Sequence, residues 1–368
     1  MKFRCERDVL VEALGITGRA AAGKGPGPVV LSGVHLQVAG DQLRLAGNDR
    51  DLTIQTEVTV AGSQDGSCVI PARLAVDIVR AFEPGAVTVE TTEDDVRISA
   101  GRSQFSLRSL PVDEFPRLPA PAEDGVTLDV PTLSAALRQV VRAASSDDAR
   151  PVLTGVLLAA DEAGLKLVAT DSYRLAVREL PGSTLLQVGQ KVLVPSRALA
   201  ELQRLLGGMG DAGEVTLRLG EFEAAFELGP TRLTTRLLQG DYPNYAGLIP
   251  SHYPNRLIIG REPLLDAARR VKLLVRDLNT PVRIALRAEG VELTVVTPDL
   301  GQAIEEVDAK YEGTEMTIAF NPTYLIDGVE AIEGDEVALE AQDGTKPATL
   351  RATEGGDYLY LLMPVRVS

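Results

Sequence analysis

The sequence predicts an α+β protein made of three copies of one domain, in which helices pack on antiparallel sheets. A β-branched strand that runs through Pro or Asn-Pro into an amphipathic helix occurs three times, at residues 68–82, 191–206 and 317–332. The spacing is nearly constant, because the aligned Pro71, Pro195 and Asn321 lie 124 (195 − 71) and 126 (321 − 195) residues apart. A chain of 368 residues is also too long for one ordinary core, so several domains are expected.

The order of elements in each copy is helix, strands, helix, strands. Each copy opens with a helix in which apolar residues recur four positions apart: Leu10 and Leu14, Leu133 and Leu137, Leu264 and Ala268. Alternating stretches such as LKLVATD and VELTVVTPD follow and predict paired strands. The second helix is the repeated one, with a proline where the first turn has no partner for an N–H. Each copy ends in a further alternating stretch, SQFSLRSL, TRLTTRLL or DYLYLLMP.

Turns with several prolines separate the copies. They are DEFPRLPAPAEDG at 113–125 and DYPNYAGLIPSHYP at 241–254. We therefore expect domains at residues 1–120, 126–248 and 253–368. A period this long excludes a short-repeat solenoid, whose units span about 20–50 residues.

Cysteine content and hydropathy favour a cytoplasmic protein. Cys5 and Cys68 are the only cysteines and lie in apolar stretches, which fits a reducing compartment. No apolar run approaches the length of a membrane span, and the start MKFRCERDVL lacks the apolar core of a signal peptide. We expect no membrane partner.

The overall charge argues against nucleic acid as a partner, but the placement of the charges argues for it. There are 37 Lys and Arg against 52 Asp and Glu, a net charge of −15. Screening limits each charge to a range of about 10 Å, so the local pattern decides. In the repeated helices, positions spaced i, i+4, i+7 share one solvent-exposed face. In the first copy this face carries Arg73, Asp77 and Arg80, and in the second copy Arg197, Glu201 and Arg204. The third copy is the exception, with Asp327, Glu330 and Glu333.

The opening helices are basic on their polar faces as well. In the second copy the helix expected over 131–146 carries Arg138 and Arg142. In the third copy the helix expected over 262–278 carries Arg269, Lys272 and Arg276 on one face, at i, i+3 and i+7. Five of the six helices carry Arg or Lys there, so the sequence predicts a positive surface on an otherwise acidic protein. Such a surface neutralises phosphates without reading sequence, as a protein that tracks the DNA backbone requires. An acidic remainder disfavours unspecific contact with DNA elsewhere. The candidate DNA-binding residues are Lys24, Arg73, Arg80, Arg138, Arg142, Arg150, Arg197, Arg204, Arg269, Lys272 and Arg276.

Several motifs have a family resemblance. They are the opening MKF..ER..L, GRS.FSLRSLP..EFP.L (101–118), ARPVLTGV (149–156), VATDSYRLAV (168–177), GDYPNY (240–245), IAFNP.YL (318–325) and YLLMPVR (360–366). Across its whole length the chain resembles the bacterial DNA polymerase III β subunit, the DNA sliding clamp. This resemblance implies three clamp domains per subunit and a head-to-tail homodimeric ring, with helices lining the inside and antiparallel sheets outside. The implied function is non-catalytic: the ring encircles duplex DNA and tethers the replicative polymerase.

The resemblance also implies two protein contacts. A closed head-to-tail dimer would bring Phe105 and Leu107 of one subunit against Leu273 and Leu274 of the other. A hydrophobic pocket between the second and third domains would bind short peptides of the polymerase α subunit, the clamp loader, and repair and translesion polymerases. The matching pocket residues are Thr170, Ser172, Tyr173, Arg174, Leu175, Pro243, Leu248, Asn321, Tyr324, Thr345, Leu361, Met363, Pro364, Val365 and Arg366.

Three positions depart from common family patterns. Ser172-Tyr173 stands where some members have Gly-His, which would alter one rim of the pocket. Val152 stands where some members have an aromatic DNA contact, and the loop 23–28 is unusually rich in Gly and Pro, which affects the role of Lys24.

Two other classes of function compete with this interpretation. An enzyme would need a catalytic cluster, but Asp49, Asp171 and Asp299 occupy equivalent positions after strands, where Asp usually accepts hydrogen bonds from turn N–H groups. The two histidines lie far apart in sequence, and nothing in the sequence predicts a phosphate loop, a metal site or a cofactor. A repeat scaffold that binds only proteins is the second alternative. The arginine-bearing faces argue against it, although sequence alone leaves it open.

Overall fold

The computed structural model describes residues 1–21, 28–93, 95–118, 120, 122, 124–210, 213–277 and 280–366. The chain divides into two compact units. Unit 1 contains Met1–Leu133 and Arg197–Leu237, and unit 2 contains Ser134–Ser196 and Leu238–Ser368. The division falls inside α3 (Val130–Val140) and at the start of α4 (Ser196–Leu206), so each unit combines one end of the chain with part of its middle.

Unit 1 has two antiparallel sheets. The five-stranded sheet has the order β5 (Ala61–Gln64), β1 (Lys2–Glu6), β7 (Ala86–Thr91), β8 (Asp95–Ala100) and β9 (Ser103–Arg108). The eight-stranded sheet has the order β10 (Val126–Asp129), β15 (Glu214–Leu219), β16 (Glu223–Leu228), β17 (Thr231–Arg236), β4 (Leu52–Thr59), β3 (Gln42–Asn48), β2 (Gly33–Ala39) and β6 (Gly66–Pro71). Strands from the first and the middle third of the chain therefore form one sheet, joined where β17 pairs with β4.

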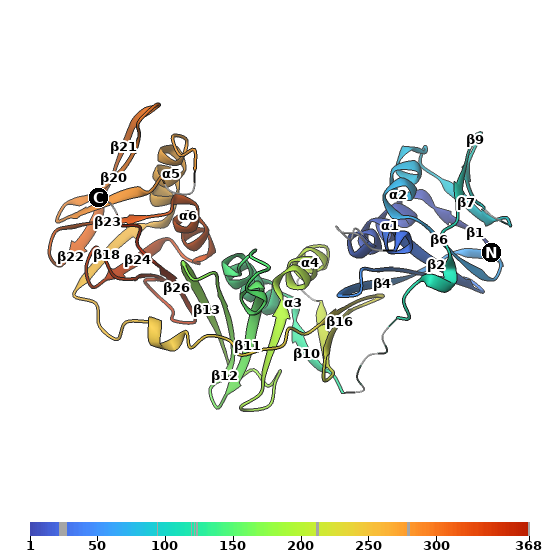
Figure 1. Ribbon diagram of the computed structural model, residues 1–368, viewed down its shortest axis with the longest axis horizontal. Coiled ribbons are helices and arrows are strands. Elements are labelled where there is room, and N and C mark those ends of the chain that lie inside the picture. The colour runs from blue at the N-terminus through green and yellow to red at the C-terminus, as the bar shows by residue number, and fades with distance from the viewer. Residues whose placement is uncertain are drawn as a thin grey trace. The chain divides into compact units, whose positions relative to one another are not determined.

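Two helices pack between these sheets. α1 (Arg7–Ala21) contacts β1 as well as β2, β3 and β4, and it lies beside α2 (Ala72–Ala81) (Figure 1). A single apolar core results, which includes Phe3, Leu14, Leu45, Ile70 and Val79, all of them almost fully buried. The predicted apolar positions Leu10 and Leu14 lie in this core, which confirms the orientation of the opening helix.

Unit 2 repeats this arrangement. Its nine-stranded sheet has the order β14 (Lys191–Pro195), β11 (Gly155–Asp161), β12 (Gly164–Thr170), β13 (Arg174–Pro181), β26 (Tyr358–Leu362), β25 (Ala348–Ala352), β24 (Glu336–Ala341), β18 (Asn255–Gly260) and β22 (Ala309–Glu312). The four-stranded sheet has the order β21 (Gly301–Val307), β20 (Gly290–Thr297), β19 (Val282–Arg287) and β23 (Met316–Phe320). Again the middle and the last third of the chain share one sheet, here through the antiparallel pair β13–β26.

α5 (Arg261–Lys272) and α6 (Pro322–Ala331) lie side by side in unit 2, as α1 and α2 do in unit 1 (Figure 1). α5 also contacts β18 of one sheet and β20 and β21 of the other. The Asn321 side chain accepts hydrogen bonds from the backbone N–H groups of Thr323 and Tyr324, which fixes the start of α6. The repeated strand-to-helix segments at 68–82, 191–206 and 317–332 thus form the predicted β-strand and helix in each copy.

Two predicted helices are shorter than expected. The opening helix expected over 131–146 ends at Val140 and continues as the 3₁₀ turn η3 (Val141–Ala143). The helix expected over 262–278 ends at Lys272. Within the described part of the chain, every helix is too short or too polar to cross a bilayer.

Candidate functional sites

The basic residues of α2 lie on its exposed side. Arg73 and Arg80 are exposed, whereas Ile78 and Val79 on the other side are buried. Arg80 forms an ion pair with Asp77 of the preceding turn, with 3.8 Å between Nη1 and Oδ1. α2 therefore has the basic and apolar faces that its sequence predicts.

α4 carries Arg197 and Arg204 on its exposed side, but its acidic residue behaves differently. Glu201 is buried and forms ion pairs with Arg204 and with Arg19 of α1, whose Nε lies 3.1 Å from Glu201 Oε2. The prediction that residue 201 shares the solvent-exposed face is wrong, because Arg19 packs over it. Arg197 pairs with Asp49, with 2.5 Å between Nη2 and Oδ2.

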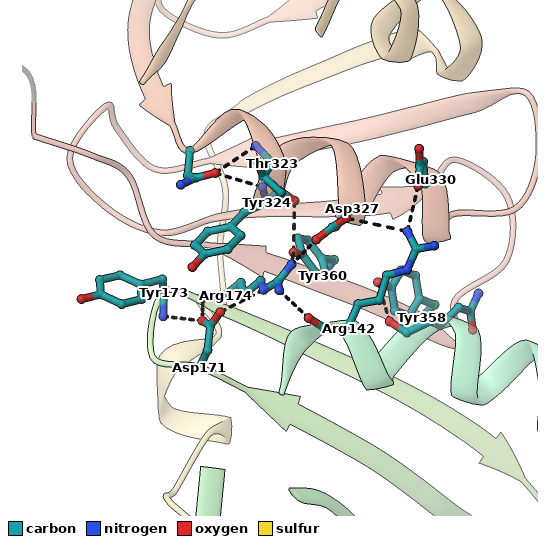
Figure 2. Close-up of polar contacts among 12 residues, drawn as sticks. Arg142, Asp171, Tyr173, Arg174, Thr323, Tyr324, Asp327, Glu330, Tyr358 and Tyr360 are labelled. Carbon is teal, nitrogen blue, oxygen red and sulfur yellow. Dashed lines mark hydrogen bonds and ion pairs between the residues drawn. The ribbon is translucent and has the colours of Figure 1, made fainter. Parts of the chain in front are cut away.

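Three predicted DNA contacts in unit 2 face carboxylates of α6 or of the residues just after it. The pairs are Arg138–Glu333, Arg142–Glu330 and Arg269–Glu330, each with 2.8 Å between nitrogen and oxygen. Arg142 also lies 3.7 Å from a carboxylate oxygen of Asp327, as Figure 2 shows for this part of the network. The acidic helix that stands out in the sequence therefore supplies counter-charges to arginines of α3, η3 and α5.

The remaining predicted cations lie at helix ends and loops. Arg150 precedes the 3₁₀ turn η4 (Pro151–Thr154), pairs with Asp147 at 3.0 Å and donates to the Ser172 hydroxyl at 2.9 Å. Lys272 is the last residue of α5, so Arg276 lies beyond the helix. The prediction that Arg276 shares one helical face with Arg269 and Lys272 is therefore wrong. Lys24 lies outside the described residues.

These arginines stay accessible although most are paired. The side chains of Arg80, Arg142, Arg197 and Arg204 are each more than half exposed. Exposed ion pairs are individually weak, because water and salt screen them and both side chains lose freedom. Phosphate oxygens accept hydrogen bonds from a guanidinium in the same bidentate geometry as carboxylate oxygens. A phosphate can therefore take the place of these carboxylates.

The predicted pocket residues gather around the turn between β12 and β13. Asp171 Oδ1 accepts from the backbone N–H groups of Tyr173 (2.9 Å) and Arg174 (3.0 Å), and Thr170 Oγ1 accepts from Ser172 N at 3.1 Å. These bonds hold Ser172 at a φ of 79°, a region that favours glycine. They leave Tyr173 60% exposed, stacked on Tyr324 of α6 with ring centroids 6.5 Å apart (Figure 2).

Arg174 lies beneath this turn, and its guanidinium donates hydrogen bonds to several partners within unit 2. Its side chain is only 10% exposed. Its guanidinium donates to Asp171 (3.0 Å), Asp327 (2.6 Å), the Tyr360 hydroxyl (3.3 Å) and the backbone carbonyl of Arg142 (Figure 2). Burial opposes its charge, but the contacts with Tyr360, Asp327 and Asp171 outweigh it and raise the pKa of Arg174. Arg174 therefore joins η3, β13, α6 and β26, and its contact with a bound peptide stays a prediction.

An apolar floor lies beside this network. Leu175 and Leu361 belong to a buried cluster of β11–β14 and β26, on which four residues of the linker after β17 pack: Leu238, Tyr242, Tyr245 and Ile249. None of these four is in the predicted pocket set, although the exposed Pro243 and Leu248 that lie between them in sequence are. Leu248 lies in the 3₁₀ turn η5 (Ala246–Leu248). Thr345 is exposed in the turn after β24, where it donates to Asp343 at 2.7 Å.

The C-terminal tail closes one side of the same region. Met363 N donates to Tyr173 O, and Val365 N donates to Ala319 O, both at 2.8 Å. Met363 is 39% exposed, Pro364 and Val365 are partly exposed, and Arg366 is exposed. The structure thus brings the 170–175 turn, the start of α6 and the tail together. No described contact joins Thr345 to them.

The predicted dimer residues divide by burial. Leu273 is 83% exposed just after α5 and Phe105 is 43% exposed on β9, whereas Leu274 is half-buried. Leu107 is buried in the core of unit 1. β9 and β21 are each the last strand of their sheet, so each offers an unpaired strand edge.

Two of the three candidate catalytic aspartates, Asp49 and Asp171, serve as turn residues. Asp49 Oδ1 accepts from the N–H groups of Asp51 (3.1 Å) and Leu52 (2.8 Å), as Asp171 does in its own turn. Among the described residues, no group of three or more His, Cys, Asp or Glu side chains could hold a metal ion. A cavity of about 510 Å³ opens on the eight-stranded sheet between β2–β4 and β16–β17. His35 on its wall stacks on Phe115 at 5.2 Å, and burial lowers the pKa of its imidazole.

Comparison with known proteins identifies the family. Three family models cover almost the whole chain: the N-terminal domain of the DNA polymerase III beta subunit over residues 1–119, the central domain over 127–244 and the C-terminal domain over 246–366. The beta sliding clamp of Streptomyces coelicolor is 37% identical and that of Synechocystis sp. 33% identical, each over the full length of both chains.

Solved structures agree with this result over all of both chains. The DNA polymerase sliding clamp of Bacillus subtilis matches with a TM-score of 0.92 at 29% identity. That of Bartonella birtlesii, bound to griselimycin, matches with a TM-score of 0.93 at 30% identity. The fold is therefore that of a sliding clamp for DNA polymerase. The chain belongs to the bacterial DNA polymerase III β subunit family, and its function is that of a DNA sliding clamp, a non-catalytic processivity factor of DNA replication.

Proposed function

We propose that two copies of this chain close head to tail into a ring around duplex DNA, in the cytoplasm at the replisome. The ring slides without sequence preference and tethers the replicative polymerase. The observation that carries this proposal is the placement of exposed arginines on α2, α3, α4 and α5 of a chain with a net charge of −15. The proposed domains are 1–120, 126–248 and 253–368, which is supported by the ranges of the three family models.

The DNA contacts we propose are the described cations of the predicted set, each of them exposed or partly exposed. Arg142 and Arg269 are the most informative pair, because both are exposed and both pair with Glu330. Contacts of this kind release counterions, so the logarithm of affinity falls with the logarithm of salt by about 0.9 per phosphate contact.

The double variant Arg142→Ala with Arg269→Ala tests this assignment. We expect weaker binding to a short linear duplex at low salt, with a salt slope reduced by about 2. Fluorescence anisotropy across a salt series measures both quantities. Arg44→Ala is the matched control, because Arg44 is an exposed, paired arginine on β3. An equal loss in the control, or no loss in the double variant, would refute the assignment.

The partner site we propose consists of the 170–175 turn, the linker at 242–249, the start of α6 and the tail. Exposed Tyr173 and Met363 stand beside the apolar floor of Leu175 and Leu361, which suits a short, partly apolar peptide. The proposed partners are the polymerase α subunit, the clamp loader, and repair and translesion polymerases. That the related clamp of Bartonella birtlesii binds griselimycin supports a small-ligand site in this fold.

Calorimetric titration with a short peptide from the α subunit of the same organism tests this site. We expect Tyr173→Ala and Met363→Ala to weaken binding, each by roughly tenfold, because each removes apolar contact area. Phe222→Ala, an exposed aromatic residue of unit 1, is the control and should bind normally. Unchanged affinity in both pocket variants would place the peptide site elsewhere.

A further inference from the structure

Three carboxylates, Asp327 and Glu330 of α6 and Glu333 just beyond its C-terminal end, form what we call the carboxylate strip. They contact arginines from three other elements: Arg138 of α3, Arg142 of η3 and Arg269 of α5. Glu330 alone bridges two of these arginines, through Oε2 to Arg142 and through Oε1 to Arg269, both at 2.8 Å. The strip therefore touches every exposed arginine that we assign to DNA on the helices and 3₁₀ turns of unit 2.

The position of the strip in the repeat is informative. Glu330 aligns with Arg80 of α2 and Arg204 of α4, so the charge at this place is reversed in the third copy. In the other two copies the acidic partner lies one turn earlier on the same helix, as in the pairs Arg80–Asp77 and Arg204–Glu201. In the third copy the helix has no arginine of its own and instead pairs with its neighbours.

Glu330 is charged under the conditions in which DNA binds. A hydrogen bond from Arg269 lowers the pKa of its carboxyl, and Arg142 adds to this effect against a smaller opposing effect of burial. A carboxylate and a phosphate accept from the same guanidinium N–H groups in the same bidentate geometry. The two acceptors therefore compete directly for Arg142 and Arg269.

We propose that the carboxylate strip is an internal competitor for DNA phosphates, which weakens the hold of the α3–η3–α5 surface on the duplex. Each arginine that leaves a phosphate returns to a carboxylate instead of remaining unpaired. This lowers the cost of exchanging contacts along the backbone, as sliding requires. The proposal rests on the proposed role of Arg138, Arg142 and Arg269 as DNA contacts.

The variant Glu330→Gln tests this proposal in the full-length protein. It removes the charge that holds two arginines and keeps the size of the side chain. We expect several-fold tighter binding to a short linear duplex at low salt, with a salt slope steeper by about 1 to 2. Glu333→Gln frees one arginine, Arg138. The salt slope of this variant should therefore change by about half as much as that of Glu330→Gln. Thermal melting of both variants verifies that they fold.

The control is Glu57→Gln on β4, which changes the net charge by the same amount. Glu57 pairs with Arg44 at 2.6 Å and its side chain is 47% exposed, against 31% for Glu330, but its partner is not an assigned DNA contact. Tightening of equal size in Glu57→Gln would show that only net charge matters, and would overturn the proposal.

The double variant Arg142→Ala with Arg269→Ala separates the two levels of the argument. If it loses affinity while Glu330→Gln and Glu333→Gln bind like the unchanged protein, the competitor role is refuted and the DNA contacts stand. If it keeps full affinity, the DNA contacts themselves are wrong and the competitor role fails with them. The proposal is supported if Glu330→Gln binds DNA more tightly and this gain in affinity disappears when Arg142 and Arg269 are also replaced by alanine.

Discussion

Gly328 and Gly15 both lie inside helices, yet their surroundings differ completely. A Cβ on Gly328 of α6 would lie 2.3 Å from Cδ1 and 2.4 Å from Cε1 of the Tyr360 ring. That ring is buried, and its hydroxyl donates to the carbonyl of Tyr324 at 3.1 Å. A Cβ on Gly15 of α1 would have nothing within 4 Å. One glycine is therefore required by packing and the other is not.

We predict opposite effects of alanine at these two positions. Gly15→Ala should stabilise the protein by about 0.8 kcal/mol, because alanine favours the helix. Gly328→Ala should destabilise it by about 1–3 kcal/mol, because the Tyr360 ring must move. Urea unfolding of both variants measures the two changes in the free energy of unfolding. Stabilisation by Gly328→Ala would show that Tyr360 does not pack as described.

At the residue scale, the sequence predicts side-chain roles correctly where a local rule applies. It predicts Asp49 and Asp171 as turn residues, and both accept from turn N–H groups. It could not predict the partners of Arg174, because Asp327 and Tyr360 lie more than 150 residues away in sequence. It likewise placed Glu201 in solvent, since no local pattern reveals that Arg19 covers it.

At the scale of elements, Arg174 connects α6 to β26, to η3 and to the turn between β12 and β13. Its guanidinium contacts two carboxylates, one hydroxyl and one backbone carbonyl from different elements, and its Cζ lies 4.3 Å from the Tyr324 ring centre. Two of these elements, α6 and the 170–175 turn, carry the residues of the proposed peptide site. The geometry of that site therefore depends on a residue that is itself almost inaccessible.

We predict that Arg174→Ala lowers the free energy of unfolding by about 3 kcal/mol, because it removes the closest ion-pair partner of the largely buried carboxylates of Asp171 and Asp327. Arg174→Lys should recover little of this loss, since one ammonium group cannot reach all four acceptors. Urea unfolding measures the stability of both variants. Full stability in the lysine variant would contradict the role of the guanidinium as a brace between elements.

The elements themselves were predicted well, and their ends less well. The threefold strand-to-helix repeat gave the right element at each site because its apolar period and its proline signal are local. The ends of α3 and α5 were placed too late, and the arginines beyond them extended the apparent helical face. The acidic α6 looked like an exception in the sequence, and only the contacts with Arg138, Arg142 and Arg269 give it a physical reason.

At the scale of the whole molecule, each unit has an edge strand with an exposed apolar side chain on it or near it in sequence. β9 and Phe105 belong to unit 1, and β21 and Leu273 belong to unit 2. An edge of this kind promotes pairing with another chain unless it is covered. Two complementary edges on one chain therefore suit a closed head-to-tail dimer.

We predict that Phe105→Ala and Leu273→Asp each shift the protein toward monomer, because each removes apolar area from the proposed contact. Sedimentation velocity over a range of protein concentrations measures the change. Val188→Asp is the control, since Val188 is 69% exposed in the segment between β13 and β14, outside both edge strands. A dimer in which both variants are as stable as the unchanged protein would require a different interface.

The most direct test of the account is retention on closed circular duplex DNA. The clamp is loaded by the clamp loader of the same organism with ATP, separated from free protein by gel filtration, and the circle is then cut by a restriction enzyme. The account predicts that the clamp stays with the closed circle at a salt concentration that abolishes ordinary contacts, and that it is released when the circle becomes linear. A clamp that stays on the linear product, or that is never retained on the circle, would contradict a ring around DNA.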